Sequence, residues 1–201
     1  LAAGSGQRMQ SSVPKVLHNI CGKEIIRHVI DNAYELHSGQ IIVVVSPDHI
    51  SQIKEIVHRD CIFILQDMPL GTADALFQVK DHLSEDFQNL LVVYGDNVLD
   101  DSNLMNAVMK RHIDTDADIT LLAKVLDKPQ GYGRIIKNES GDIVRVLEQK
   151  ELSAGQESIK EVNGGIYCFR VNWLKNNLDK VTKSKISNEF YLTDLVSIAY
   201  E

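Results

Sequence analysis

The chain opens with Leu1-Ala2-Ala3-Gly4-Ser5-Gly6-Gln7-Arg8-Met9, and Pro14-Lys15 follows five residues later. Glycines let the backbone turn sharply and point bare N–H groups at an anion. The stretch is not a dinucleotide-binding G-x-G-x-x-G, because Met9 stands at the third glycine, and no Gly-Lys-Ser/Thr follows to make a P-loop. It therefore predicts another kind of nucleoside-triphosphate loop, with Arg8 and Lys15 on the phosphates. The alternative is that these two residues are solvated surface charges.

The composition predicts one globular domain over residues 1–201. The chain is 44% hydrophobic and 24% charged, which suits a sizeable core. A net charge of −7 argues against a nucleic-acid partner and requires local cations and a metal ion to hold an anionic substrate. Three widely spaced cysteines predict reduced thiols in a cytoplasmic protein. No apolar stretch reaches membrane-spanning length, so we expect no membrane partner.

Strand and helix patterns alternate along the first 125 residues. Apolar spacing predicts helices at 24–36, 48–59, 72–83, 101–113, 172–178 and 191–200, with Asp48 capping the second. Buried apolar runs predict strands at 41–45, 61–65, 90–94 and 118–125, and shorter strands follow at 133–136, 143–147 and 162–169. This order predicts an α/β fold of three α/β/α layers, Rossmann-like, with a mostly parallel sheet and a small antiparallel part.

Asp96 follows the predicted strand 90–94 directly. Ligands of open α/β sheets bind at the carboxyl ends of strands, and Mg²⁺ prefers one or two carboxylates with substrate phosphates and water. Asp96 is therefore the candidate magnesium ligand. Gly95-Asp96-Asn97 is also good turn chemistry, so a turn or helix-cap role is the alternative.

Several segments, in order, resemble the sugar-phosphate nucleotidyltransferases. The opening L-A-A-G-x-G-x-R-M and P-K-V-L-H carry the resemblance first. The later segments are Tyr94-Gly95-Asp96, Gly131-Tyr132-Gly133-Arg134-Ile135, Asn163-Gly164-Gly165-Ile166-Tyr167 and Glu189-Phe190-Tyr191-Leu192-Thr193-Asp194. Within this family the chain is most similar to the uridylyltransferase domain of bacterial bifunctional N-acetylglucosamine-1-phosphate uridyltransferases, which are also glucosamine-1-phosphate acetyltransferases. The resemblance implies the GT-A-like fold of nucleotide-diphospho-sugar transferases, with its antiparallel part binding the sugar.

The resemblance also implies an activity and a set of site residues. The activity is Mg²⁺-dependent transfer of UMP from UTP to N-acetylglucosamine 1-phosphate, giving UDP-N-acetylglucosamine and pyrophosphate. Arg8 and Lys15 are the implied catalytic cations. The implied nucleotide-binding residues are Leu1, Ala2, Ala3, Gly4, Lys15, Gln66, Gly71 and Thr72, with Gln66 and Thr72 on the uracil edge. The implied sugar-phosphate residues are Gly133, Glu148, Asn163, Tyr191 and Thr193, and the implied metal ligand is Asp96.

Simpler structural roles are open for several of these residues. Thr72 can cap the next helix, Tyr191 can be a packing residue at a helix start, and the glycine-rich segments can be tight turns. Two positions depart from the family pattern. Asp74 stands where the family commonly has histidine, and Gly164 replaces a frequent hydroxyl residue. His18 belongs to the P-K-V-L-H segment, but its role does not follow from the sequence.

The resemblance carries expectations about the whole protein. The loop motif normally follows a buried strand, so we expect a chain cut at its N-terminus and also at its C-terminus. Hexapeptide repeats are absent, so we expect the acetyltransferase β-helix to lie outside this chain. Because that half normally drives trimer formation, the full-length protein is expected to be a homotrimer and this piece a monomer. The alternatives are a cytidylyl- or thymidylyltransferase for another sugar or polyol phosphate, and a catalytically silent nucleotide-binding domain.

Overall fold

The computed structural model describes residues 1–4, 6, 11, 13–37, 39–98 and 102–201. Its helices are α1 Ile25–Glu35, α2 Ile50–Ile56, α3 Thr72–Val79, α4 Asn103–Thr115, α5 Val171–Asn177 and α6 Asp194–Tyr200. Its strands are β1 Asn19–Ile20, β2 Lys23–Glu24, β3 Ile42–Val45, β4 Ile62–Leu65, β5 Asn89–Val93, β6 Ile119–Val125, β7 Arg134–Lys137, β8 Ile143–Leu147 and β9 Glu161–Arg170. Short 3₁₀ turns include Lys15–Leu17 and Gln149–Glu151.

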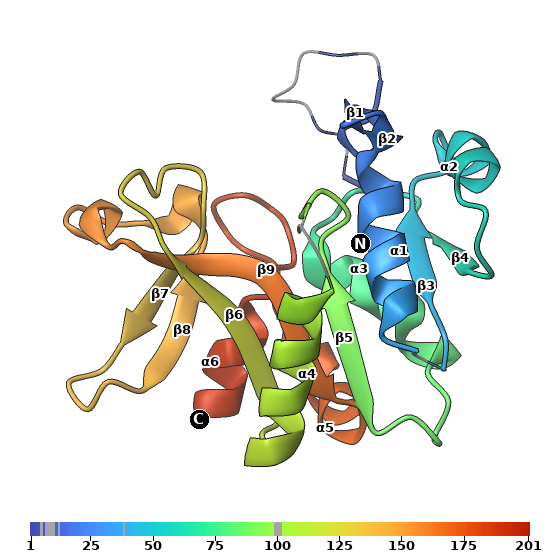
Figure 1. The fold of residues 1–201 in the computed structure, drawn as a ribbon. Coiled ribbons are helices and arrows are strands. Elements are labelled where there is room, and N and C mark those ends of the chain that lie inside the picture. The colour runs from blue at the N-terminus through green and yellow to red at the C-terminus, as the bar shows by residue number, and fades with distance from the viewer. Residues whose placement is uncertain (5, 7–10, 12, 38, 99–101) are drawn as a thin grey trace.

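The strands form a parallel portion and an antiparallel portion that lie side by side (Figure 1). β3 and β4 pair in parallel, from Ile42 opposite Ile62 to Val45 opposite Leu65. β9 pairs antiparallel with β5 and β6 and meets β7 at one position, and β7 pairs antiparallel with β8. The small hairpin of β1 and β2 stands apart.

The N-terminal segment joins the two portions. The Ala2 N–H donates to the Val44 carbonyl at 2.8 Å, and the Leu1 amino group donates to the Val93 carbonyl at 2.7 Å. The Gly95 N–H in turn donates to the Leu1 carbonyl at 2.7 Å. Bonds from Leu1 to the residues on both sides of Tyr94 are the pattern of parallel pairing. The first two residues therefore lie between β3 and β5.

Helices cover both faces of the strands, as the alternating side chains of β3 illustrate. Val43 and Val45 pack in a core with Ile26 and Ile30 of α1. Val44 points the other way, into the core that includes α3, α5 and α6. Because successive side chains of a strand leave opposite faces, each face needs its own cover. The three α/β/α layers are confirmed.

β9 is buried from Val162 to Phe169, without interruption. Ile166 and Cys168 pack with Met105 and Val108 of α4, whereas Tyr167 and Phe169 pack into the core on the opposite face. β5 and β6, which the sequence predicted within the mostly parallel sheet, pair antiparallel with this strand. The antiparallel portion is therefore larger than expected, because an apolar run marks burial but not strand direction.

One expected helix cap is wrong. α2 begins at Ile50, and His49 occupies its N-cap position without a side-chain bond. The His49 N–H donates to the Ser46 carbonyl at 3.2 Å, so Pro47 and Asp48 are the central residues of a tight turn. Proline favours that turn position, and the turn uses the residues that the pattern assigned to the first helical turn.

The three cysteines are free: Cys21 is exposed, Cys61 is partly buried and Cys168 is buried. Within the described residues, no helix has the length and apolar character needed to cross a bilayer.

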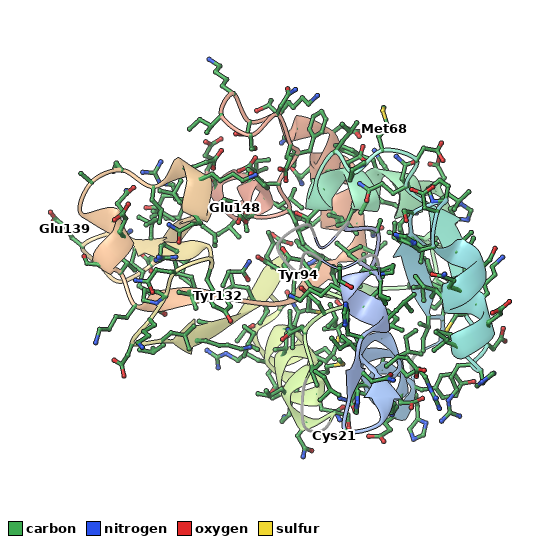
Figure 2. All side chains as sticks on the ribbon, turned by 90° about the horizontal axis from the view of Figure 1, so that it is seen from above. Cys21, Met68, Tyr94, Tyr132, Glu139 and Glu148 are labelled. Carbon is green, nitrogen blue, oxygen red and sulfur yellow. The ribbon has the colours of Figure 1, made fainter. Side chains whose placement is uncertain are left out.

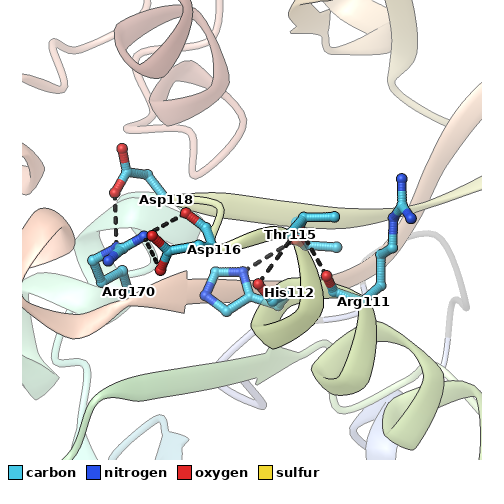
Figure 3. A network of polar contacts seen from close by, with 7 residues as sticks. Arg111, His112, Thr115, Asp116, Asp118 and Arg170 are labelled. Carbon is cyan, nitrogen blue, oxygen red and sulfur yellow. Dashed lines mark hydrogen bonds and ion pairs between the residues drawn. The ribbon is translucent and has the colours of Figure 1, made fainter.

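A polar network fixes the outer ends of β6, β9 and α4 (Figure 3). Arg170, the last residue of β9, forms ion pairs with Asp116 at 2.8 Å and with Asp118 at 3.0 Å. His112 is 2% exposed, and its Nδ1 lies 3.0 Å from the Thr120 hydroxyl. Burial, and secondarily the charge of Arg170, lower the pKa of His112 below its ordinary value of 6.5.

The pKa of His112 predicts a loss of stability in acid. The unfolded chain takes up the proton first as pH falls below about 6.5, because the folded pKa is lower. The contribution of neutral, buried His112 to the free energy of unfolding is thus complete above that pH, and it is lost as pH falls towards the folded pKa. We expect His112→Asn to reduce the loss in free energy of unfolding between about pH 7.5 and about pH 5.5, measured by urea denaturation. The matched control is His58→Asn, since His58 is exposed. An equal loss in free energy of unfolding on acidification for the parent and both variants would contradict the prediction.

Candidate active site

The ends of three neighbouring segments meet at one edge of the sheet. The Gln66 N–H donates to the Val45 carbonyl at 2.9 Å, which places Gln66 just beyond β4 and beside the end of β3. Ala2 bonds to Val44, and Gly95 bonds to Leu1. Gly4, Gln66 and Asp96 therefore follow segments that end at the same edge, with β3 between the first two of these segments. This is the edge where open α/β sheets bind ligands.

Lys15 and Asp96 form an ion pair at this edge, although they are far apart in sequence. The Lys15 Nζ lies 2.5 Å from the Asp96 Oδ2, and the two side chains are 41% and 37% exposed. Their exposure leaves both groups within reach of a ligand. A pair at this exposure contributes little to folding, so its importance lies in the charges that it brings together. Arg8, the second expected cation, lies outside the described residues.

Glycines let the backbone approach closely on both sides of this pair. Gly6 has φ +60°, and a Cβ there would lie 3.0 Å from the Cβ of Lys15. A Cβ on Gly95 would lie 2.9 Å from the Leu1 carbonyl oxygen. The Asn97 amide donates to the Gly164 carbonyl at 2.8 Å, so the residues on both sides of Asp96 are anchored. Asp96 lies in a turn, and this position also leaves its carboxylate exposed beside Lys15.

His18 supports the segment that carries Lys15. Its Nε2 lies 3.2 Å from the Val13 carbonyl oxygen, and its backbone carbonyl accepts from the Ile25 N–H at 2.9 Å. His18 thus ties the residues before Lys15, through its side chain, to the start of α1, through its backbone carbonyl. This is a structural role for the residue that the sequence left unexplained.

The buried side chain of Gln66 holds the segment from Gln66 to Asp74 by hydrogen bonds to its other end. Gln66 is 5% exposed, and its Nε2 donates to the Gly71 carbonyl at 3.0 Å and to the Asp74 Oδ2 at 2.6 Å. The expected capping alternative for Thr72 is wrong, because Gly71 holds the N-cap position of α3 and no side chain caps that helix. The Thr72 hydroxyl instead accepts from the Leu192 N–H at 2.9 Å.

The same loop is bonded to the segment from Phe190 to Leu192. The Phe190 N–H donates to the Leu70 carbonyl at 2.7 Å, and the Phe190 carbonyl accepts from the Ala73 N–H at 3.0 Å. Gly71 has φ +117°, and a Cβ there would lie 2.2 Å from the Phe190 oxygen. No other residue type fits this position without displacing the backbone of Phe190.

The expected sugar residues gather on the antiparallel side. The Asn163 N–H donates to the Gly133 carbonyl at 2.9 Å, and the Asn163 Oδ1 accepts from the Gly165 N–H at 2.9 Å. The Thr193 hydroxyl donates to a Glu148 carboxylate oxygen at 3.1 Å. In Figure 2, Tyr94 lies near the middle of the molecule, and Tyr132 and Glu148 lie between it and Glu139. The structure therefore brings Gly133 next to Asn163 and Glu148 next to Thr193.

Burial raises the pKa values of acidic and phenolic groups on this antiparallel side. The expected sugar residues there (Gly133, Glu148, Asn163, Tyr191 and Thr193) are called the wall below. Burial raises the pKa of Glu148, the Thr193 hydroxyl partly offsets this, and nearby Glu151, Asp194 and Glu189 raise it further. Burial and the charge of Glu151 raise the pKa of Asp194 to about 6. Burial also raises the pKa of Tyr191, which is 6% exposed and lies before α6 rather than inside it.

Two further features on this antiparallel side depend on contacts between distant segments. Arg134 is fully buried, and its guanidinium donates to the Tyr132 carbonyl and, at 3.1 Å, to the Gln149 Oε1. Gln149 Oε1 also accepts from the Gly131 N–H at 2.9 Å. Gln149 therefore bonds to both ends of the segment from Gly131 to Arg134. A Cβ on Gly164 would lie 2.7 Å from the Leu122 carbonyl oxygen, which explains glycine in place of a hydroxyl residue. Neither contact has a signal in the local sequence.

Comparison with known proteins agrees with the resemblance. The family model described as "Nucleotidyl transferase" matches residues 1–201, and the chain belongs to this family. It is similar to the "Bifunctional protein GlmU" of Thermoanaerobacter pseudethanolicus, with 38% identity over 198 residues that cover 98% of this chain and 43% of that protein. The protein of the same name from Geobacillus thermodenitrificans gives the same identity and coverage. That from Desulfotalea psychrophila is 34% identical over 199 residues, 99% of this chain and 59% of its own length.

The resemblance to nucleotidyltransferases and the α/β fold are thus confirmed. The chain spans 43% of the length of the first two relatives.

The Gly71 geometry predicts a large and local loss of stability. We expect Gly71→Ala to lower the free energy of unfolding by about 3 kcal/mol or more, because backbone strain and a backbone clash add together. Gly141→Ala is the matched control, since Gly141 also has a positive φ of 89° but nothing lies near its missing Cβ. The control is expected to lose only about 1 kcal/mol in chemical denaturation. Similar losses for the two variants would contradict the packing of Gly71 against Phe190.

Proposed function

We propose that this chain transfers UMP from UTP to N-acetylglucosamine 1-phosphate, giving UDP-N-acetylglucosamine and pyrophosphate. A phosphate oxygen of the sugar phosphate attacks the α-phosphorus of UTP, and the bond from that phosphorus to pyrophosphate breaks. The observation that carries the proposal is the Lys15–Asp96 pair at the ligand-binding edge of the sheet, beside the Leu1–Gly4 segment. A magnesium triphosphate supplies a partner for each of these charges.

The reaction needs electrostatics more than a general base. A phosphate monoester is largely dianionic near neutral pH, because its second pKa is about 6. Positioning and positive charge therefore dominate phosphoryl transfer, and we extend this to nucleotidyl transfer. Lys15 acts as a mobile positive charge on the phosphates, and Arg8 is proposed as a second.

Asp96 is the proposed magnesium ligand. Its carboxylate is partly exposed at the sheet edge and already accepts a cation, the Lys15 ammonium, which fits a group that holds a metal. Mg²⁺ is commonly bound by one or two carboxylates together with substrate phosphates. No cluster of three or more potential metal ligands occurs among the described residues, so the phosphates would have to complete the set. When bound, Mg²⁺ would neutralise charge on the triphosphate.

The remaining residues bind and orient the two substrates. Leu1, Ala2, Ala3, Gly4 and Gly71 are proposed to line the nucleotide, and Gln66 and Thr72 are proposed on its base. The buried amide of Asn163 and the half-buried carboxylate of Glu148 are proposed on the sugar, with Gly133, Tyr191 and Thr193 completing the wall. Convergent polar groups of this kind fix the orientation of a polar ligand.

For the whole protein we propose a bacterial bifunctional enzyme that supplies cell-envelope precursors. The names of its longer relatives support two activities in one chain. A cytoplasmic location and a homotrimer are part of the same proposal.

A substrate panel tests the proposal. UTP, CTP and dTTP are each combined with several sugar 1-phosphates, and pyrophosphate release is measured with Mg²⁺. Release is expected only with UTP and N-acetylglucosamine 1-phosphate. Preference for another pair would indicate a different nucleotidyltransferase, and silence across the panel would favour a binding domain.

Asp96→Asn is expected to reduce Mg²⁺-dependent pyrophosphate release by about a hundredfold or more, because a charge-stabilising ligand is lost. The fold should persist, since the carboxylate is exposed and the amide has the same shape. The exposed Asp60→Asn serves as the matched control and should keep full activity. Unchanged release in Asp96→Asn would remove this residue from the metal site.

Asn163→Ala is expected to raise the dissociation constant of the sugar phosphate by a factor corresponding to about 1–3 kcal/mol, because a buried polar contact is lost. The dissociation constant of UTP should stay close to that of the parent. Calorimetry measures both ligands, and a thermal unfolding curve shows whether the lost bond to Gly165 disturbs the fold. Equal weakening of the two ligands in a folded variant would contradict the sugar assignment.

A further inference from the structure

Gln66 and Asp74 form a buried pair that the family resemblance does not explain. Gln66 is 5% exposed and Asp74 is 9% exposed, and 2.6 Å separates the Gln66 Nε2 from the Asp74 Oδ2. Asp74 lies in the first turn of α3, where the helix dipole favours a negative charge.

This pair determines which way round the Gln66 amide lies. An ionised carboxylate only accepts hydrogen bonds, and so does the Gly71 carbonyl, the second partner of the Gln66 Nε2 at 3.0 Å. With the amide reversed, its oxygen would face two other oxygens inside a buried site. Both N–H donors of Gln66 are therefore committed, and its Oε1 is the atom left for another partner. No described residue donates to that Oε1.

We propose that Asp74 is a positioning residue that sets the base specificity of the nucleotide site. By holding the Gln66 nitrogen, Asp74 makes Gln66 an obligatory hydrogen-bond acceptor towards the base. Such an acceptor matches the N3–H of uracil, whereas the N3 of cytosine carries a lone pair and is repelled. The inference rests on the proposed function, because it takes UTP as the nucleotide and Gln66 as a residue of its base pocket.

The test compares two substitutions that differ only in their ability to accept from Gln66. Asp74→Leu has a similar shape but no acceptor, so only the Gly71 carbonyl still holds the Gln66 nitrogen, and reversing the amide to donate to cytosine costs less. Asp74→Asn can still turn its oxygen towards the Gln66 nitrogen. Equilibrium dissociation constants of UTP and CTP are measured with Mg²⁺ for the parent and both variants.

We expect the parent to prefer UTP, Asp74→Leu to lose about tenfold in the CTP-to-UTP ratio of dissociation constants, and Asp74→Asn to retain most of it. A folded Asp74→Leu variant with the parent's ratio would overturn the proposal. Loss of the preference for UTP over CTP in both variants would also overturn the proposal, because Asp74→Asn keeps an acceptor for the Gln66 nitrogen.

A second measurement needs no variant and covers the case in which Asp74→Leu fails to fold. N3-methyl-UTP lacks the donor that Gln66 is proposed to recognise, whereas 5-methyl-UTP keeps it. The parent is expected to bind N3-methyl-UTP about tenfold or more weakly than UTP, and 5-methyl-UTP within about twofold. Equal affinity for N3-methyl-UTP and UTP would overturn the inference. Because these are binding measurements, the absence of pyrophosphate release in the panel would refute the proposed reaction separately.

Discussion

The arrangement of the site depends on the backbone bonds of Leu1 and Ala2. These two residues bond to Val44 of β3 on one side and to Val93 and Gly95 on the other. Through them the parallel pair β3–β4 adjoins the antiparallel portion built on β9. Buried backbone groups have to find partners, so this segment has little freedom to lie elsewhere. Because it is held there, the residues after β4 and after β5 lie at the same edge as Gly4 and Gly6.

A second set of backbone bonds links the proposed base loop to the proposed sugar wall. Phe190 bonds to Leu70 and Ala73, and Leu192 bonds to the Thr72 hydroxyl. The segment that carries these bonds continues directly to Thr193, which donates to Glu148. The two proposed binding regions are therefore joined by hydrogen bonds through one segment rather than carried on independent loops. Fixed relative positions suit a reaction whose rate depends on bringing two polyanions together in a defined geometry.

The sequence predicted the elements better than their pairing. The apolar runs in β3, β5 and β9 and the helical spacing of α1 were readable because burial leaves a periodic trace. Strand direction left no such trace, so the extent of antiparallel pairing around β9 was not foreseen. The cap of α2 was misassigned because a proline turn competed for the same residues.

The candidate site was predictable only where the family motifs mark it. Lys15 and Asp96 were both expected near phosphates, but no local pattern indicates that they form an ion pair across 81 positions of sequence. The buried Arg134 and the Gln66–Asp74 bond were missed for the same reason, because each depends on partners that the fold supplies. Gly164 looked like a departure, yet the Leu122 carbonyl explains it.

A crystal structure with UTP and Mg²⁺ would show where the triphosphate lies relative to the Lys15 Nζ and the Asp96 Oδ2. We expect phosphates beside Gly4 and Gly6, with the Lys15–Asp96 bond broken and each side chain on its new partner. A triphosphate bound away from these two glycines, with the 2.5 Å pair intact, would contradict the proposed site.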